Sequence, residues 1–394
     1  MSFAATGRPV GRHRPAAGRH RIPAADALPG ATTGFTRAAL GVALAVAASA
    51  MTSAPVHAEP APAPPAVDPA VVRTELVGSE SRGQGWERLY VASAAMQRVV
   101  PIDVLHGTGT DPKPALYLLD GVEGAPTSGW LTDGDAARFF AGKPVDVVLP
   151  GGGVGSMYSD WDRYDGALGL NRWETFLVDE LPPIVEKYLH SDGRRAIAGV
   201  SMGAQAAMML VQRHPGFYRA VAGISGCYST ADDVGQAVTR ITVASRGGNP
   251  ENLWGPPNSP EWAAHDSYLG AEQLRGTPIY LSAASGLPSP PDLGTIVGAH
   301  DVADALRAAG GGVVLEAGAR TCTERFAARL DQLRIPATVR YVPAGTHSWP
   351  DFTAALPSAW DALAAGLGIS RTWGPHRRWP GSSERAEGIE HSDR

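Results

Sequence analysis

The sequence predicts an α/β fold in which a mostly parallel sheet carries helices on both faces. Short apolar runs bounded by turn residues, such as 115–119 and 145–149, are typical of strands buried on both faces. Strand-like and helix-like segments alternate along the chain, as they do where helices connect parallel strands. A G-x-S-x-G sequence, residues 199–203, stands where a predicted strand passes into a predicted helix. Together these observations predict the α/β-hydrolase fold.

Each element is predicted from local pattern and its neighbours. Strands are rich in apolar and β-branched residues and end at Gly, Pro or Asp, whereas helices repeat apolar residues at helical spacing. The predicted strands are 88–93, 99–105, 115–119, 145–149, 195–198, 279–282 and 337–341. The predicted helices are 135–140, 173–189, one from about Gly203 to His214, and one over about 322–333.

The ends of the chain predict export. Residues 1–58 combine a basic extension with an apolar run from Ala38 to Met51, which is shorter than the roughly 20 residues that span a bilayer. Small residues follow the run, so we expect a signal peptide cleaved after Ala58 and a secreted or envelope-associated protein. Residues 59–71 then form a Pro/Ala-rich linker, 72–369 the catalytic domain, and 370–394 a polar tail predicted to be disordered.

The composition limits which partners and cofactors are expected. The formal net charge of −5 does not provide the basic face that nucleic-acid binding needs. No clustered His, Cys, Asp or Glu spacing matches a ligand set, so we expect neither a metal nor another cofactor. Cys227 and Cys322 form an even pair in an exported chain, which favours one disulfide, with two free buried thiols as the alternative.

Ser201 is the candidate nucleophile. It lies at the centre of Gly199-Val-Ser-Met-Gly203, and the flanking glycines fit a strained turn on which larger side chains would collide with neighbouring elements. A serine hydroxyl needs a base to take its proton, and the base needs an acid to orient it.

His347 is the candidate base, because it lies in a turn just after the last predicted strand. The other histidines after Ser201 lie at a helix end, in irregular stretches or in the tail: His214, His265, His300, His376 and His391. For the acid, chain order leaves Asp292, Asp301, Asp304, Glu316, Glu324 and Asp331 open, with Asp292 favoured by spacing after the strand 279–282.

The oxyanion hole needs two converging backbone N–H groups. The residue after the nucleophile, Met202, supplies one of them in this fold. The second should come from the turn after the strand 115–119, where Asp120-Gly121 precedes Val122, so we expect Met202 and Val122 to be the donors.

Several motifs resemble the antigen 85 mycolyltransferases and their corynebacterial relatives, secreted enzymes of the α/β-hydrolase fold. The resemblance spans about Ala115 to Leu367 and rests on rare residues in the same order. The motifs are Leu118-Leu-Asp-Gly121, Met157-Tyr-Ser-Asp-Trp161, Trp173-Glu-Thr-Phe176, Gly199-Val-Ser-Met-Gly203, Leu253-Trp-Gly-Pro256 and Thr346-His-Ser-Trp-Pro350.

The resemblance implies transfer of a mycolyl group from trehalose monomycolate to a second trehalose monomycolate or to arabinogalactan. It implies a triad of Ser201, Glu316 and His347, and so selects Glu316 as the acid. It also implies that Asp120 and Trp349 line the sugar site. Where the best-known members carry an arginine after the Asp-Gly pair, this chain has Glu123, which we therefore expect near the acceptor.

Two other functions remain open on the sequence. A secreted carboxylesterase would form the same acyl-enzyme and release the acyl group to water. A non-catalytic, envelope-binding protein could keep the fold, although the complete set of Ser201, Glu316 and His347 disfavours it.

Overall fold

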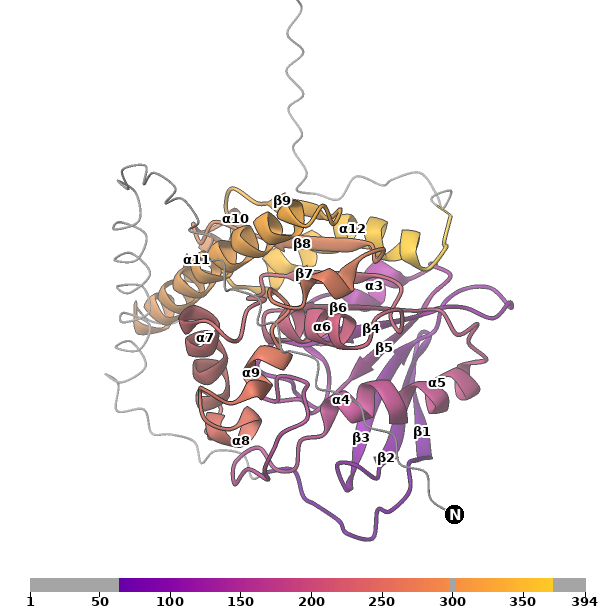
Figure 1. Ribbon diagram of the computed structural model, residues 1–394. Helices are drawn as coiled ribbons and strands as arrows, with labels where there is room; N and C mark the ends of the chain where they lie inside the picture. Colours follow the sequence, from indigo (N-terminus) through magenta and orange to yellow (C-terminus); the bar gives the residue numbers. More distant parts are fainter. Residues whose placement is uncertain (1–63, 298–301, 371–394) are drawn as a thin grey trace, which may run out of the picture. The chain divides into compact units, whose positions relative to one another are not determined.

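The computed structural model describes residues 64–297 and 302–370. Within them, nine strands form one sheet in the order β1-β2-β3-β5-β4-β6-β7-β8-β9 (Figure 1). The first three strands and the β3–β5 pair run antiparallel, and the pairs from β5 to β9 are parallel. The strands are β1 (Glu75–Gly83), β2 (Trp86–Ser93), β3 (Arg98–Leu105), β4 (Ala115–Leu119), β5 (Asp146–Pro150), β6 (Arg195–Val200), β7 (Val221–Ile224), β8 (Ile279–Ala283) and β9 (Thr338–Tyr341).

Helices cover both faces of the sheet, as predicted. Alternate residues of the fully buried strand β4 point to opposite faces, so that Tyr117 and Leu119 belong to one core and Leu116 and Leu118 to the other. One core is completed by α4 (Trp173–Thr175), α5 (Leu181–Leu189), α6 (Met202–Arg213) and part of α11 (Val302–Gln332). The other is completed by α2 (Gly129–Thr132), α3 (Ala136–Phe140) and α12 (Trp349–Gly366).

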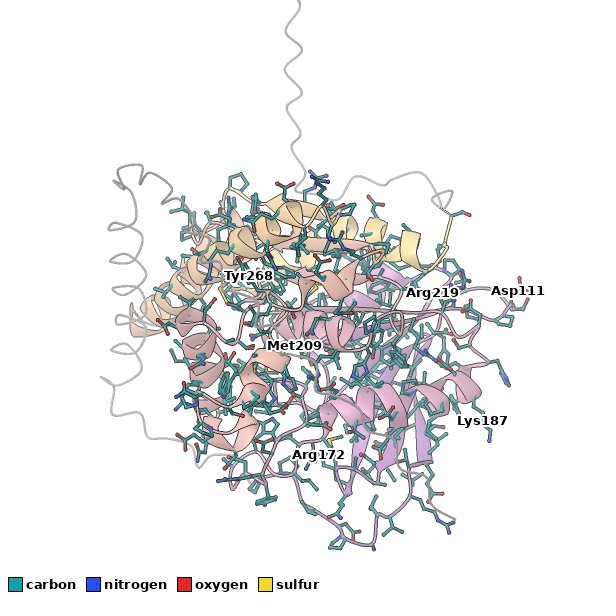
Figure 2. The ribbon with its side chains drawn as sticks, viewed as in Figure 1. Asp111, Arg172, Lys187, Met209, Arg219 and Tyr268 are labelled. Atoms are coloured by element: carbon teal, nitrogen blue, oxygen red, sulfur yellow. A yellow bond between two sulfur atoms is a disulfide. The ribbon has the colours of Figure 1, made fainter. Side chains whose placement is uncertain are left out.

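Helix α6 runs through the first of these cores. Ten of its residues are buried, among them Met209, which is labelled in Figure 2. Its first turn lies at the end of β6, next to the point where β4 is flanked by β5 on one side and β6 on the other. Ligands of α/β sheets bind at such a switch in strand order, beyond the carboxyl ends of the strands.

Several elements differ from the sequence prediction. Strand β1 was not predicted, because its exposed, mostly polar sequence lacks an apolar face. The helix predicted at 322–333 begins twenty residues earlier, as α11 from Val302, although three consecutive glycines, 310–312, oppose helix formation. The predicted helix 173–189 is interrupted by a π-helical turn, Phe176–Glu180, just before Pro182 and Pro183, which have no N–H to donate.

The region between β7 and β8 was expected to be irregular, but it contains three α-helices and a short 3-10 helix, Ala271–Leu274. The α-helices are α7 (Asp233–Ala244), α8 (Pro250–Trp254) and α9 (Pro260–Ala264), and each begins at an Asp, Asn or Ser whose side chain caps its first turn. These capping residues were a signal that the sequence prediction did not use.

The predicted signal peptide and most of the linker and tail lie outside the described residues. The described end of the linker is in contact with the domain: the Asp68 N–H donates to the Gln97 carbonyl at 2.7 Å. In the described part of the chain, no helix combines the length and apolarity needed to cross a membrane.

Candidate active site

Ser201 occupies a strained turn between β6 and α6. Its φ of +55° and ψ of −119° lie outside the regions that L-residues favour. A Cβ at Gly199 would lie 2.2 Å from the Gly203 carbonyl oxygen, and one at Gly203 would lie 2.4 Å from that of Asp120. Glycine is therefore required at both positions for the turn to close.

His347 contacts Ser201 and Glu316 at once. Its Nε2 lies 2.7 Å from Ser201 Oγ, and its Nδ1 lies 2.8 Å from Glu316 Oε2. An ionised carboxylate only accepts hydrogen bonds, so the proton of a neutral imidazole resides on Nδ1 and Nε2 is free to accept from the serine hydroxyl. The structure thus brings together the three residues that the family resemblance selected.

Glu316 is fully buried on α11, and its carboxylate is held by two further donors. Ser225 Oγ donates to Oε1 at 2.8 Å, and the Ala284 N–H donates to the same atom at 2.6 Å. Neither donor was predicted from the sequence. The disulfide between Cys227 and Cys322 is present and connects the end of β7 to α11, six residues beyond Glu316.

Asp292, which spacing alone favoured as the acid, is not hydrogen-bonded to the His347 ring, whose two nitrogens contact Glu316 and Ser201. It accepts instead from the hydroxyls of Thr346 and Ser348, at 2.8 and 2.9 Å. These residues immediately precede and follow His347.

Each of the two candidate oxyanion donors is adjacent in the chain to Ser201 or to a residue that packs against it: Met202 follows Ser201, and Val122 follows Gly121. Met202 begins α6, so its N–H belongs to the first helical turn, whose donors have no acceptor within the helix. Val122 follows Gly121, where an added Cβ would lie 3.5 Å from Ser201 Cβ. The Val122 carbonyl accepts from the Gly155 N–H at 3.0 Å, which orients this part of the loop.

Asp120 and Trp349 are linked through α2. Ser128, the N-cap of α2, donates to Asp120 Oδ1 at 2.9 Å, and burial of the Asp120 carboxyl raises its pKa to about 7. Trp130 on the same helix packs edge-to-face against Trp349, with ring centroids 5.4 Å apart. Both residues are therefore positioned by contacts with α2.

Glu123 lies apart from this pair, and its side chain is 73% exposed. It forms an ion pair with Arg246, whose Cβ and Cγ lie over Gly155. Arg246 follows α7 and was not among the predicted site residues. The chain thus has a guanidinium close to the position where the resemblance leads one to expect an arginine.

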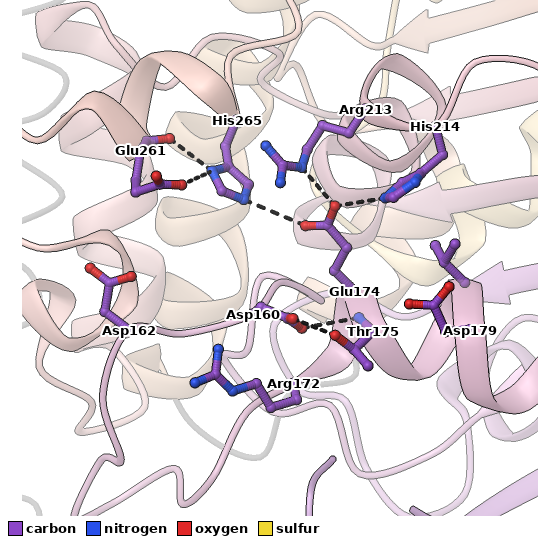
Figure 3. Close-up of a pocket in the computed structure, with 11 residues that line it drawn as sticks. Asp160, Asp162, Arg172, Glu174, Thr175, Asp179, Arg213, His214, Glu261 and His265 are labelled. Atoms are coloured by element: carbon purple, nitrogen blue, oxygen red, sulfur yellow. Dashed lines mark hydrogen bonds and ion pairs between the residues drawn. The ribbon is translucent and has the colours of Figure 1, made fainter.

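A polar cavity of about 360 Å³ lies at the other end of α6 (Figure 3). Glu174 is at its centre and contacts Arg213, His214 and His265. His214, at the end of α6, is half-buried, with Nε2 2.7 Å from Glu174 Oε1. Within residues 64–297 and 302–370, no group of three or more His, Cys, Asp or Glu is arranged to hold a metal ion.

The sheet topology and the turn that carries Ser201 define an α/β-hydrolase. Residues 93–363 match the family model described as "Putative esterase". The diacylglycerol acyltransferase/mycolyltransferase Ag85A of Mycobacterium tuberculosis is 31% identical over 318 residues, which cover 78% of this chain and 89% of the relative. The chain therefore belongs to this esterase family and, within it, to the antigen 85 family, so it is an acyl-transferring or ester-hydrolysing enzyme.

Solved structures agree with this assignment. MPT51 (FbpC1) of Mycobacterium tuberculosis is 26% identical, with a TM-score of 0.60, and the match covers 72% of this chain and 99% of that one. An S-formylglutathione hydrolase from Agrobacterium tumefaciens is 16% identical, with a TM-score of 0.55, and the match covers 75% of this chain and 100% of that one. At this identity the match supports the fold alone.

Proposed function

We propose that the protein is a secreted serine acyltransferase that moves a mycolyl group from trehalose monomycolate to a second trehalose monomycolate or to arabinogalactan. The observation that carries the proposal is the pair of hydrogen bonds that His347 makes to Ser201 and Glu316. The name of the relative Ag85A, a diacylglycerol acyltransferase/mycolyltransferase, supports the acyl-transfer class.

In the first half-reaction, Ser201 Oγ attacks the ester carbonyl carbon as its proton passes to His347 Nε2. The imidazolium that forms is stabilised by the buried Glu316 carboxylate. The N–H groups of Met202 and Val122 would hold the oxyanion. His347 then gives its proton to the leaving sugar oxygen, the ester bond breaks, and the acyl group remains on Ser201.

In the second half-reaction, an acceptor hydroxyl replaces the departed sugar. His347 takes its proton, its oxygen attacks the acyl-enzyme, and Ser201 leaves with that proton restored. Transfer and hydrolysis differ only in whether the attacking hydroxyl belongs to a sugar or to water. Asp120, Trp349 and the Glu123–Arg246 pair are the residues that we propose to favour the sugar.

The test is incubation with trehalose monomycolate, with trehalose dimycolate and free mycolate measured separately. Formation of the dimycolate, and its loss in Ser201→Ala, is the expected result. Free mycolate as the sole product would instead establish the carboxylesterase function. A chain that yields neither product and does not react with a fluorophosphonate probe would be the non-catalytic, envelope-binding protein.

A further inference from the structure

The turn that carries His347 is held between two carboxylates. The Thr346 N–H donates to Asp351 Oδ2 at 2.7 Å and to Asp292 Oδ2 at 3.1 Å. Ser348 Oγ lies 2.9 Å from Asp292 Oδ1 and 3.0 Å from Asp351 Oδ2. The residues on both sides of His347 are therefore bonded to the same two aspartates.

Each aspartate belongs to the first turn of a helix that starts beside the site. Asp292 lies on α10 (Pro290–Val297), where it and Ser289 bond reciprocally, the Ser289 N–H donating to Asp292 Oδ2 at 2.8 Å. This is a capping box. Its other oxygen, Oδ1, is thereby left for Thr346 and Ser348.

The start of α12 departs from this pattern. Ser348 is its N-cap and Asp351 is three residues later, yet the Ser348 side chain makes no capping hydrogen bond. Its hydroxyl lies instead within reach of the two carboxylates, and Asp351 bonds the N–H of Thr346. Groups that would ordinarily cap a helix are thus used to hold the His347 turn.

The two carboxyl groups are in different electrostatic situations. Burial acts to raise the pKa of Asp292, but hydrogen bonds from Ser289, Thr346 and Ser348 outweigh it and lower that pKa to about 2. Burial and the Asp292 charge together raise the pKa of Asp351 to about 6. Asp292 is therefore ionised at neutral pH, and hydrogen bonds to an ionised acceptor are stronger than those to a neutral one.

We propose that Asp292 and Asp351 are positioning residues that keep His347 Nε2 on Ser201 while Nδ1 stays on Glu316. The backbone N–H of His347 itself donates a hydrogen bond to the Gly312 carbonyl at 3.2 Å. Displacement of a catalytic group by about 1 Å can cost roughly a hundredfold in rate. This inference rests on the proposed acyl transfer at Ser201.

The experiment compares Asp292→Asn with Asp165→Asn. Asp165 is a matched control, because it is also buried and accepts hydrogen bonds from the backbone of Ala167, Leu168 and Asn249, and not from the turn that carries His347. Steady-state hydrolysis of a p-nitrophenyl ester, the rate of fluorophosphonate labelling and the thermal unfolding temperature are measured for both. The downfield proton resonance of the His347 Nδ1–H is recorded as well.

In Asp292→Asn we expect kcat and the labelling rate to fall about 10- to 100-fold with KM unchanged within about twofold, and the downfield resonance to weaken. Asp165→Asn should lower the unfolding temperature while leaving kcat within about twofold. If Asp292→Asn does not fold, Ser348→Ala, which removes the bonds to both carboxylates, should lower kcat several-fold.

Two results would overturn the positioning role. One is unchanged kcat and resonance in folded Asp292→Asn or Ser348→Ala; the other is an equal loss of kcat in Asp165→Asn. Failure of the proposed function is a separate outcome: a carboxylesterase would still turn over the ester and yield only free mycolate from trehalose monomycolate, and a non-catalytic wild-type protein would neither turn over the ester nor react with the probe.

Discussion

The two ends of α6 carry the same kinds of side chain in different arrangements. At its start, Ser201 meets a histidine that is backed by a buried glutamate. At its end, roughly 18 Å away at 1.5 Å per residue, Arg213 and His214 meet the buried Glu174, which His265 also approaches. A glutamate paired with histidine is therefore common to both ends.

The two ends differ in what the ring nitrogens of their histidines contact. At the Glu174 end, His214 Nε2 bonds the carboxylate, and His265 Nδ1 bonds the Glu261 carbonyl while its ring stacks on Trp254. No hydroxyl takes part in these contacts, and the Arg213 guanidinium balances the charge of the Glu174 carboxylate. At the Ser201 end, one imidazole nitrogen is satisfied by Glu316 and the other remains available for a serine proton. The candidate catalytic cluster therefore differs from the structural one in having a ring nitrogen available next to a serine on a strained turn.

The sharpest test of this comparison is removal of the hydroxyl. Ser201→Ala should lower kcat/KM by about 10⁴-fold or more, because the triad acts as a unit. Stability should be almost unchanged. His347→Ala should have a comparable effect on the rate and Glu316→Ala a smaller one, since the acid orients the base. Ester hydrolysis and thermal unfolding measure the two quantities, and more than a few per cent of residual activity in Ser201→Ala would show that another residue is the nucleophile.

The sequence predicted the parts of this site that depend on local geometry. The turn at Ser201 is marked by Gly199 and Gly203, whose backbones touch neighbouring strands and helices. Glu316 was different, because chain order allowed six acids and only the family resemblance singled it out. Its selection depends on Ser225 and Ala284, which approach it across the sheet.

The hydrogen bonds that hold the His347 turn could not be predicted from local sequence for a similar reason. Asp292 and Asp351 each stand three residues after a serine, which by itself indicates a helix N-terminus. Their bonds to Thr346 depend on how α10 and α12 meet. Strand β1 was missed because it is defined by its backbone pairing with β2 and not by an apolar face, and the early start of α11 was missed because its three consecutive glycines disfavour a helix.

A second prediction concerns the structural end of α6. Burial acts to raise the pKa of Glu174, but hydrogen bonds from His214, His265 and Arg213 lower it below the ordinary value. Glu174→Gln should therefore cost about 2–4 kcal/mol of unfolding free energy at pH 7, because Arg213 loses a largely buried partner. Ester hydrolysis at a temperature where the variant is folded should stay within about twofold of wild type.

The sign of the pH dependence follows from the lowered pKa. Glu174 binds its proton more weakly in the folded state, so its contribution is present above the unfolded pKa of about 4.3 and declines as pH falls below it. Denaturant unfolding of wild type and Glu174→Gln should thus differ most near pH 7 and less near pH 3. An equal difference at both values would mean that the carboxylate charge does not stabilise the cluster, and a large loss of kcat would mean that the two ends of α6 are not independent.

The smallest expected effect is at the exposed ion pair between Glu123 and Arg246. Glu123 and Arg246 join the loop that carries Val122 to the segment after α7, and Glu123 is mostly exposed. Exposed ion pairs contribute up to about 1 kcal/mol, which corresponds to roughly fivefold in a rate ratio. Glu123→Arg places two guanidinium groups side by side, releases Arg246 and replaces a hydrogen-bond acceptor by donors. We expect kcat/KM for trehalose esters to change two- to fivefold, and kcat/KM for a p-nitrophenyl ester to change less.

Glu123→Gln, which removes only the charge, is the control and should give a smaller change in the ratio of the two kcat/KM values. Equal changes for both substrates in Glu123→Arg would show that the pair does not contact the sugar, and the distinction between the two ends of α6 would then rest on Ser201, His347 and Glu316 alone.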